Sequence, residues 1–431
     1  MSKMRYDISA NLELVSPLHI GSGEFEADPA RVPGKEGANP PAFALQVRDV
    51  NGKPVLPPTS LKGMLRSVAE RVCPDGVDRL FGTIKSGSDT GQNGGTGQAG
   101  LLTVFLGEQG KAPDVAAFPY PSNHGVFIAA RTKIDPKSGT ANDGTLFFQE
   151  MVAPESTFTL RCRLESRDQQ KLEDAKADLL LILSALRDPV GVPLGKGMAD
   201  GFGRLWLKKQ KVTLERKTMR ADGTLKTDSK DVVLAKPSAT CLTASRVTLT
   251  LNCPGPFAIL DASRISKELQ DRSDKKTDFK PQLSAQAGTG ALPLIPGTSV
   301  AGALRARAEW LAELNRLRGA PESDSLITAL FGDVGQRGQV IIDQIKVLGG
   351  TRKPMTSVKI DRFSMAPIDN ALFTTSTFIG VTATLTLSLG KPDHQAFFDR
   401  LIDDLVDNGL MLGHGVNKGF GWFTVTRDGG V

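Results

Sequence analysis

The chain has 431 residues, 40% hydrophobic and 23% charged, which is typical of a globular protein with room for two domains. It has no apolar run near the ~20 residues that a membrane helix needs, and its start lacks the apolar stretch of a signal peptide, so we expect a cytoplasmic protein. A net charge of +6 permits a polyanionic partner, while 6% aromatic residues argue against nucleic-acid binding mainly by base stacking.

A series of sequence landmarks occurs twice in the same order. The first copy consists of LELVSPLHIG from Leu12, PPTSLKGMLR with Thr59, LFG from Leu80, TKID ending at Asp135 and PLGKGMADGFGRLWL from Pro193. The second copy consists of LTLNCPGPF from Leu249, PGTSVAGALR with Thr298, LFG from Leu330, VKID ending at Asp361 and MLGHGVNKGFGWFTV from Met411. A constant order with drifting spacing indicates one fold present twice, with loops of different length.

The repeat predicts the domain boundaries. The first unit should span residues 1–208 and the second unit residues 246–431. Residues 209–245 are basic and polar, and we interpret them as a linker or a peripheral ribbon. Within them VTLE alternates and ADGT offers a turn, as an edge hairpin would require.

A helix is predicted at the TS phrase of each unit. In the first unit Thr59 and Ser60 are good N-caps, and Lys62 and Arg66 are four residues apart on one outer face. The unpaired N–H groups of a helix start favour anions there, although a charged surface helix without a ligand fits as well. The second unit keeps Thr298, Ser299 and Arg305 but has alanine where Lys62 stands, so it should hold an anion less well.

A glycine sits inside each of these helices, Gly63 in the first unit and Gly302 in the second. A glycine in a helix interior costs about 1 kcal/mol relative to alanine. Its occurrence in both copies suggests that another backbone approaches there.

The glycine-rich phrase follows a predicted helix and leads into a strand in both copies. A dinucleotide-binding fingerprint has the opposite order, strand then glycines then helix, and the spacing G-x-G-x-x-x-G-x-G does not fit a P-loop. The glycines should therefore serve a tight turn or a close partner. Lys196, His414 and Lys418 add donors beside them. Each unit thus reads as α+β, a helix-backed antiparallel sheet compatible with a βαββαβ ferredoxin-like core.

Cysteine and histidine patterns do not indicate a metal site. The four cysteines include no C-x-x-C pair, and the four histidines form no H-E-x-x-H motif. We therefore expect neither a zinc site nor a disulfide framework.

Taken together, L-H-I-G-S-G-E, the TS phrase, LFG and the final glycine phrase resemble the RAMP superfamily, and more narrowly the backbone subunits of type III CRISPR effector complexes. A chain that carries the set twice resembles fused double-backbone subunits. The resemblance implies two tandem modified ferredoxin-like (RRM-like) domains with loop and thumb insertions. It also implies CRISPR RNA, target single-stranded RNA and other effector subunits, including neighbouring backbone subunits, as partners, with no membrane involved.

The resemblance assigns RNA-binding roles to three groups of residues. The TS helices supply Thr59, Ser60, Lys62, Arg66, Thr298, Ser299 and Arg305. The glycine loops supply Gly195, Lys196, Gly197, Gly413, His414, Gly415 and Lys418. The segments RTKIDPKSGTANDG and SVKIDRFSMAPIDN resemble the family's thumb hairpin, which kinks the guide–target duplex, and supply Arg131, Lys133, Lys359 and Arg362.

In related subunits an aspartate between the first strand and the TS helix supports cleavage of the target RNA, assisted by Mg²⁺ or another divalent ion. The position that aligns with it here lies near Phe43 and is not acidic. Our candidates are therefore Asp28 in the first unit and Asp261 or Asp278 in the second. For each of them, a surface carboxylate without a catalytic role is the alternative.

Other functions stay open at this point. The same scaffold without catalysis is the first alternative, and the residue near Phe43 favours it for the first unit. A CRISPR RNA-processing endonuclease would need histidine acid–base chemistry, for which only His19 and His414 are placed near the motifs. An RNA-binding or metabolic α+β protein outside CRISPR systems is the remaining alternative.

Overall fold

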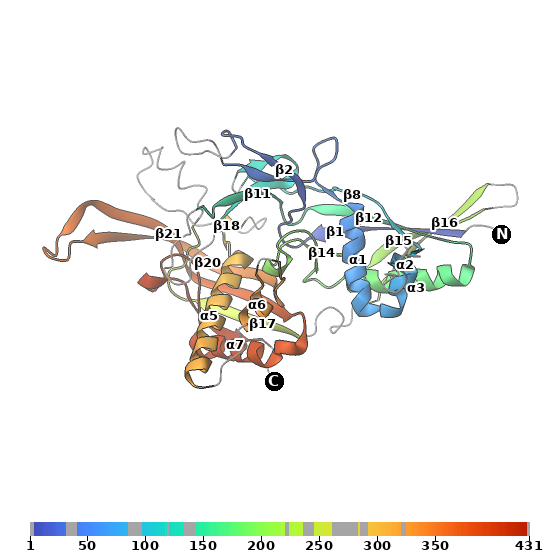
Figure 1. The fold of residues 1–431 in the computed structure, drawn as a ribbon. Coiled ribbons are helices and arrows are strands. Elements are labelled where there is room, and N and C mark those ends of the chain that lie inside the picture. Colours follow the sequence, from blue (N-terminus) through green and yellow to red (C-terminus); the bar gives the residue numbers. More distant parts are fainter. Residues whose placement is uncertain are drawn as a thin grey trace, which may run out of the picture.

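The computed structural model describes two α+β units that follow one another along the chain (Figure 1). The residues that it describes are 4–31, 41–84, 97–116, 118, 120–132, 144–219, 224–235, 245–260, 283–284, 292–319, 325–333 and 335–428. Each unit has its own hydrophobic core. No helix in these ranges is both long and apolar enough to cross a membrane.

The first unit is built on an antiparallel sheet in the order β13–β14–β1–β12–β7. Its strands are β1 (Met4–Leu14), β7 (Leu102–Val104), β12 (Thr157–Ser166), β13 (Val192–Pro193) and β14 (Arg204–Trp206). Side chains alternate across a strand, so Ile8, Leu12 and Leu14 of β1 share the buried face. Three helices pack on the core: α1 (Pro58–Val72), α2 (Val77–Phe81), which follows the short helix η1 (Pro74–Gly76), and α3 (Gln169–Ala185).

The start of α1 differs from the sequence prediction. Thr59 and Ser60 lie inside the first turn, and the cap position belongs to Pro57, whose carbonyl accepts the N–H of Leu61 (3.0 Å). Pro58 occupies the first helical position, where its fixed φ suits a helix and its missing N–H leaves no donor unpaired. The second unit repeats this: the helix starts at Gly297 after Pro296, so Ser299 is not the cap either.

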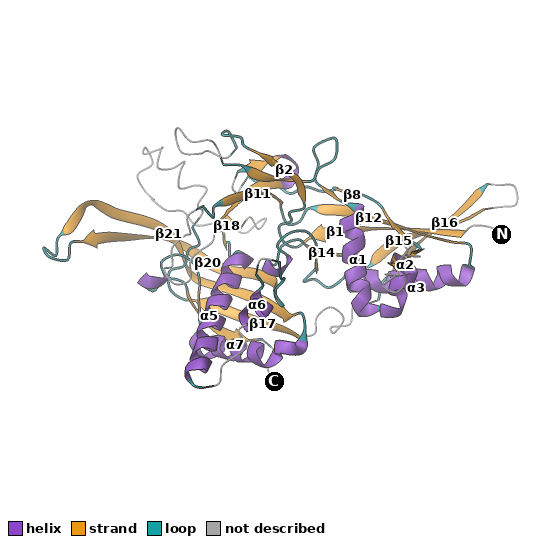
Figure 2. Ribbon diagram, in the orientation of Figure 1, coloured by secondary structure: helices purple, strands orange, loops and turns teal. Residues whose placement is uncertain are grey.

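The second unit has the same strand order in its sheet, β22–β23–β17–β21–β20. Its strands are β17 (Ser245–Cys253), β20 (Val340–Ile360), β21 (Pro367–Leu389), β22 (Leu410–Met411) and β23 (Trp422–Arg427). Helices α5 (Gly297–Leu317), α6 (Leu326–Phe331) and α7 (Gln395–Asn408) lie on one face of the sheet, and η4 (Pro392–His394) precedes α7 (Figure 2). Each unit therefore has the element order βαββαβ, which confirms that the chain repeats itself.

Strands β20 and β21 form a hairpin that extends well beyond the sheet (Figure 1, left). Their register runs from the pair Val340 and Leu389 at the base to Ile360 and Pro367 at the tip. The base is buried in the core, whereas nearly every residue from 351 to 369 is exposed. At the tip, a carboxylate oxygen of Asp361 accepts the N–H groups of Phe363 (3.0 Å) and Ser364 (2.8 Å), which closes the turn.

The first unit carries a second, insertion-derived sheet in the order β2–β3–β11–β10–β9. It is formed by β2 (Gly21–Glu26), β3 (Phe43–Gln46), β9 (Pro121–Ser122), β10 (Val126–Arg131), which follows η2 (Asn123–Gly125), and β11 (Phe147–Val152). Its pair of β3 with β11 is parallel, unlike the antiparallel sheets expected. Two-stranded sheets pair β4 (Val55–Leu56) with β8 (Gly107–Glu108), β5 (Gly82–Ile84) with β6 (Gly97–Ala99), and β18 (Leu283–Ser284) with β19 (Leu292–Pro293).

The segment after residue 208 extends the first sheet. Strands β15 (Lys211–Met219) and β16 (Leu225–Val233) form a hairpin, and β15 pairs with β1 from Met4 and Thr218 to Ser9 and Thr213. Val212 and Leu214 of β15 are buried in the core of the first unit. The sheet of that unit thus continues past the position where the sequence placed its end.

Candidate nucleic-acid interface

The two glycine loops have nearly the same backbone. Each contains a short helix, η3 (Met198–Asp200) in the first loop and η5 (Val416–Lys418) in the second. The φ angles are 86°, 74°, 80° and 68° at Gly195, Gly197, Gly201 and Gly203, and 91°, 79°, 80° and 67° at Gly413, Gly415, Gly419 and Gly421. All eight lie in the left-handed region, which glycine adopts without steric cost.

Close contacts within each loop also require glycine. A Cβ on Gly203 would lie 1.8 Å from the carbonyl oxygen of Leu194, and a Cβ on Gly421 would lie 1.8 Å from that of Leu412. Each loop is hydrogen-bonded to the segment that follows the first strand of its unit. In the first unit the Lys196 N–H donates to the His19 carbonyl (2.9 Å). His414 N–H makes the equivalent bond to Ala258 (2.7 Å). A tight structural turn therefore accounts for the glycines themselves.

The first loop brings together several of the predicted basic residues. The guanidinium of Arg131 at the end of β10 lies over the ring of Phe202, 4.1 Å from its centroid. The exposed Lys196 ammonium is 5.8 Å from the Phe147 ring centroid. Arg131 thus lies against the glycine loop, and Lys133, predicted beside it, is outside the described residues.

His19 lies beneath this group and is 2% exposed. Burial, together with the charges of Lys196 and Arg131, lowers the pKa of His19, so the ring is neutral near pH 7. Its Nδ1 is 2.7 Å from the Glu150 carbonyl oxygen, to which a neutral ring donates. His19 is therefore held in the core and not presented to a ligand.

The TS helices present their basic residues differently in the two units. Arg66 is half-exposed and its contact with Glu70 (3.3 Å) lies on the surface of α1, beside the partly buried Lys62. Arg305 of α5 also contacts Glu309 (3.0 Å), but in addition it donates to the Gly332 carbonyl at the end of α6 (3.0 Å). The TS helix of the second unit therefore lacks the lysine of the first, and its Arg305 is bound to two groups of its own chain.

The two helix glycines face open space. A Cβ built on Gly63 or on Gly302 would meet no described atom within 4 Å. No contact inside the described chain explains why both positions lack a side chain. The surface above them has room for a backbone supplied by a partner.

The tip of the β20–β21 hairpin is both basic and apolar. Lys359 and Arg362, which the resemblance assigned to a thumb hairpin, are exposed there. Phe363 is 98% exposed and Met365 is 75% exposed. Sequence reasoning had selected only the charged residues of this tip.

Asp28 lies in a local turn after β2. Its Oδ1 accepts the Ala30 N–H (2.8 Å), and its carbonyl accepts the N–H of Arg31 (3.1 Å). The Arg31 guanidinium contacts Glu26 (3.4 Å) and the fully buried Glu150 (2.8 Å). Asp261 and Asp278 lie outside the described residues.

Glu150 organises the region around Asp28, and sequence reasoning missed it. Although burial raises its pKa, the Gln46 N–H and the guanidinium groups of Arg31 and Arg48 together hold the pKa of Glu150 below its usual value. Phe43, near which the resemblance would place a catalytic aspartate, is fully buried with Arg31 over its ring (4.8 Å). A glutamate that follows a glutamine within a mainly apolar strand, FFQEMV, was the signal available in the sequence.

His414 is the other histidine that the sequence placed near a glycine loop. Partial burial and the nearby Lys418 lower its pKa, so it is neutral near pH 7. Lys418 itself is exposed in η5. The second loop thus offers one permanent cation and one ring that gains charge only in acid.

The family model described as the RAMP superfamily matches residues 11–206 and 255–424. The matched segments fall within the two βαββαβ units and include both glycine loops, although the second match begins just after β17. No curated protein matches the chain.

Proposed function

The chain belongs to the RAMP superfamily of CRISPR-associated RNA-binding proteins, and from that membership we propose that it is a backbone subunit of a type III effector complex. In this proposal it binds CRISPR RNA along two consecutive guide segments, one for each unit. Its further partners would be the target single-stranded RNA and neighbouring effector subunits.

The observation that carries the proposal is the duplication of the whole binding apparatus. Both units have the strand order expected of a ferredoxin-like core, and both place a TS helix and a glycine loop of the same backbone geometry on it. Two equal units in series would hold a linear ligand at two equivalent places. A linear polyanion is such a ligand, and the net charge of +6 favours it.

In the first unit, we propose that Lys62, Arg66 and Lys196 contact the guide phosphates. All three carry their charge at or near the surface, and Gly63 leaves room for a backbone beside them. Phosphate contacts set position and orientation, while base pairing reads the sequence. In the second unit the exposed Lys418 and the hairpin residues Lys359 and Arg362 would make most of the contacts to the guide phosphates.

Target-RNA cleavage is a further part of the proposal, with Asp28 acting in the first unit and Asp261 or Asp278 in the second. Within the described residues, no three His, Cys, Asp or Glu lie together as metal ligands. Asp28 would therefore hold Mg²⁺ only together with RNA phosphates, as is usual for this ion. Its carboxylate would place the ion, and the subunit's main contribution would be to orient the RNA.

A scaffold without catalysis is the second candidate for the first unit. The region of the buried Phe43 favours it, because the sequence there has no acidic residue at the position where the resemblance would place the catalytic aspartate. The RNA-processing alternative has less support, since His19 is enclosed in the core and one histidine, His414, is exposed near a loop.

The deciding experiment is purification of the native complex followed by sequencing of its RNA. A repeat-derived RNA of uniform length that co-purifies with the chain is expected. A complex without such RNA would reject the proposed role. Target cleavage by complexes carrying Asp28→Asn, Asp261→Asn or Asp278→Asn then separates the catalytic subunit from the inert scaffold: cutting lost at one site identifies the acting residue, and unchanged cutting at every site rejects all three.

A further inference from the structure

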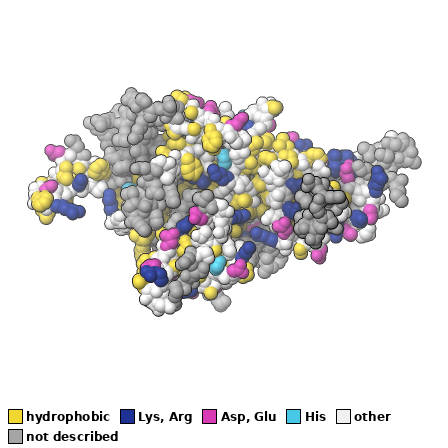
Figure 3. All heavy atoms as spheres, in the orientation of Figure 1, with side chains coloured by type: hydrophobic (Ala, Val, Ile, Leu, Met, Phe, Trp, Pro, Cys, Tyr) yellow, Lys and Arg dark blue, Asp and Glu magenta, His cyan; other side chains and the backbone are white. Residues whose placement is uncertain are grey.

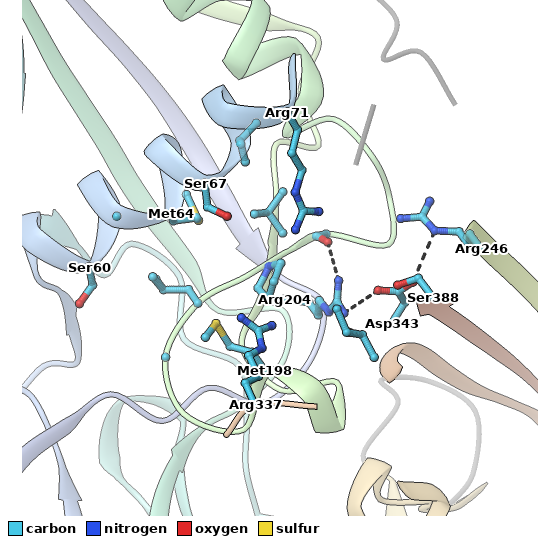
Figure 4. Close-up of a pocket in the computed structure, with 18 residues that line it drawn as sticks. Ser60, Met64, Ser67, Arg71, Met198, Arg204, Arg246, Arg337, Asp343 and Ser388 are labelled. Carbon is cyan, nitrogen blue, oxygen red and sulfur yellow. Dashed lines mark hydrogen bonds and ion pairs between the residues drawn. The ribbon is translucent and has the colours of Figure 1, made fainter. Parts of the chain in front are cut away.

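A cavity of about 450 Å³ lies where the two units meet. One wall is the α1 surface from Ser60 to Arg71 and the first glycine loop, and the other is the base of the β20–β21 hairpin (Figure 4). Residues more than 250 positions apart in the sequence, such as Ser60 and Ser388, thus face the same space. No motif of either unit alone predicts such a cavity.

The charge of this junction pocket is strongly positive. Four arginines line it, Arg71, Arg204, Arg246 and Arg337, against a single carboxylate, Asp343. Figure 4 shows these arginines converging from both units, and basic side chains gather near the middle of the molecule in Figure 3. Asp188 also pairs with Arg246 (2.9 Å), so among the described residues named here four arginines stand beside two carboxylates.

The buried part of the pocket has polar groups without partners. Arg204 is 3% exposed, and its Nη2 donates to Oδ1 of Asp343 (2.6 Å), which is 2% exposed. Within the described residues, however, Nε of Arg204, Nε of Arg246, Oδ2 of Asp343 and the Ser388 hydroxyl make no hydrogen bond. Nε of Arg246 faces that Oδ2 at 3.5 Å, which leaves Nε of Arg204 and the Ser388 hydroxyl without an acceptor among the described residues. Buried donors in a protein are almost always paired, so these two indicate an acceptor that comes from outside the chain.

Two further arginines stand at the edge of the pocket. Arg71 is exposed in the last turn of α1, and Arg337 is exposed just before β20. Arg337 makes no ion pair within the described part of the chain. Guanidinium groups facing one space from several sides suit a ligand with several charged oxygens.

We propose that the junction pocket binds a phosphate group of the guide RNA where the guide passes from the first unit to the second. The inference rests on the proposed function, because it takes the ligand to be RNA. Ser60 of α1 and Gly195 of the first glycine loop line the pocket, and these are the two elements that would hold the guide in the first unit. A guide that leaves them toward the second unit would therefore pass the pocket. Its arginines would hold the one phosphate that neither unit can bind alone.

The test uses the full chain with Arg71→Gln and Arg337→Gln, made singly and together. Both residues lie at the edge, so the buried pair of Arg204 with Asp343 stays intact. Arg318→Gln is the matched control, because Arg318 is an exposed arginine at the far end of α5, about 30 Å along that helix from its start. Binding of a labelled RNA of about 20 nucleotides is measured across a salt series.

Each pocket variant is expected to bind the RNA several-fold more weakly, and the slope of log affinity against log salt should fall by about 0.7 to 0.9 for one lost phosphate contact. Arg318→Gln should match the unaltered chain. If the pocket variants bind with unchanged affinity and slope while Lys62→Ala weakens binding, the pocket inference is wrong and the proposed function stands. If the unaltered chain fails to bind RNA, the proposed function fails and the pocket inference fails with it.

A second arm distinguishes the source of the phosphate. Thermal unfolding is followed with inorganic phosphate in the absence of RNA. One outcome is that phosphate stabilises the unaltered chain but not the double variant Arg71→Gln with Arg337→Gln. If that double variant also keeps the salt slope of RNA binding, the pocket is a site for small anions and the RNA assignment is wrong. A reduced RNA slope supports the proposal with or without that stabilisation.

Discussion

Gly297 at the start of α5 lies directly against the carbonyl oxygen of Asp200 in the first glycine loop. A Cβ on Gly297 would stand 1.7 Å from that oxygen, so at this point the two units meet backbone to backbone. The first unit has Pro58 at the equivalent place in PPTS. A proline ring there leaves no room for the same contact, so this docking is particular to the inner junction.

We therefore expect Gly297→Ala to destabilise the junction by about 1 to 3 kcal/mol, as overpacking usually does. Gly302→Ala is the matched control, since a Cβ there meets open space and alanine is the better helix residue. Denaturant unfolding of both variants should show a loss for Gly297→Ala and a gain of up to about 1 kcal/mol for Gly302→Ala. Equal stabilities would mean that the two units do not rest on each other at this point.

The pair of Arg204 with Asp343 gives a second prediction about the junction. Both side chains are buried, so Arg204→Met alone leaves a buried carboxylate whose remaining cation, Arg246, is 3.5 Å away. We expect a loss of about 3 to 5 kcal/mol in unfolding free energy. The double variant Arg204→Met with Asp343→Leu should recover most of it, because neither charge remains. Losses that simply add in the double variant would show that the two residues do not act as a pair.

The repeat and its elements were predictable because they rest on local patterns. Helix α3, helix α7 and the helix–glycine–strand order follow from periodicity and from glycine, and the structure shows each of them. The caps predicted at Thr59 and Ser60 were wrong, since the helix begins directly after Pro57, as α5 begins directly after Pro296.

The junction pocket could not be predicted in the same way. Arg204 stands in the quoted phrase GFGRLWL, but its partner Asp343 comes from the other unit. A contact between residues so far apart in sequence leaves no periodic signal in either segment. The same is true of Glu150, whose partners Arg31 and Arg48 come from a different part of the chain.

The buried His19 predicts a dependence of stability on pH. Its pKa is lowered in the folded chain, so below pH 6.5 the unfolded chain binds the proton more readily and stability falls as the pH drops. His19→Gln should remove this component, so that the difference in unfolding free energy between the two proteins narrows from pH 7 to pH 5. A constant difference for His19→Gln would mean that the ring charges equally well in the folded state.

The two TS helices predict unequal contributions to RNA binding. Lys62→Ala removes a cation from α1 and should weaken binding of the guide, with a slope against salt smaller by about 0.7 to 0.9. Ala301→Lys places a lysine at the same position of α5, where Ala301 is partly exposed, and should strengthen binding and steepen the slope by the same amount. Fluorescence anisotropy with one RNA across a salt series measures both. Glu70→Ala removes the carboxylate partner of Arg66 on the outer face of α1. The same measurement then tells whether the released Arg66 strengthens RNA binding. If Lys62→Ala and Ala301→Lys both leave the slope unchanged, the TS helices do not face the RNA, and the glycine loops with the hairpin tip must carry the binding alone.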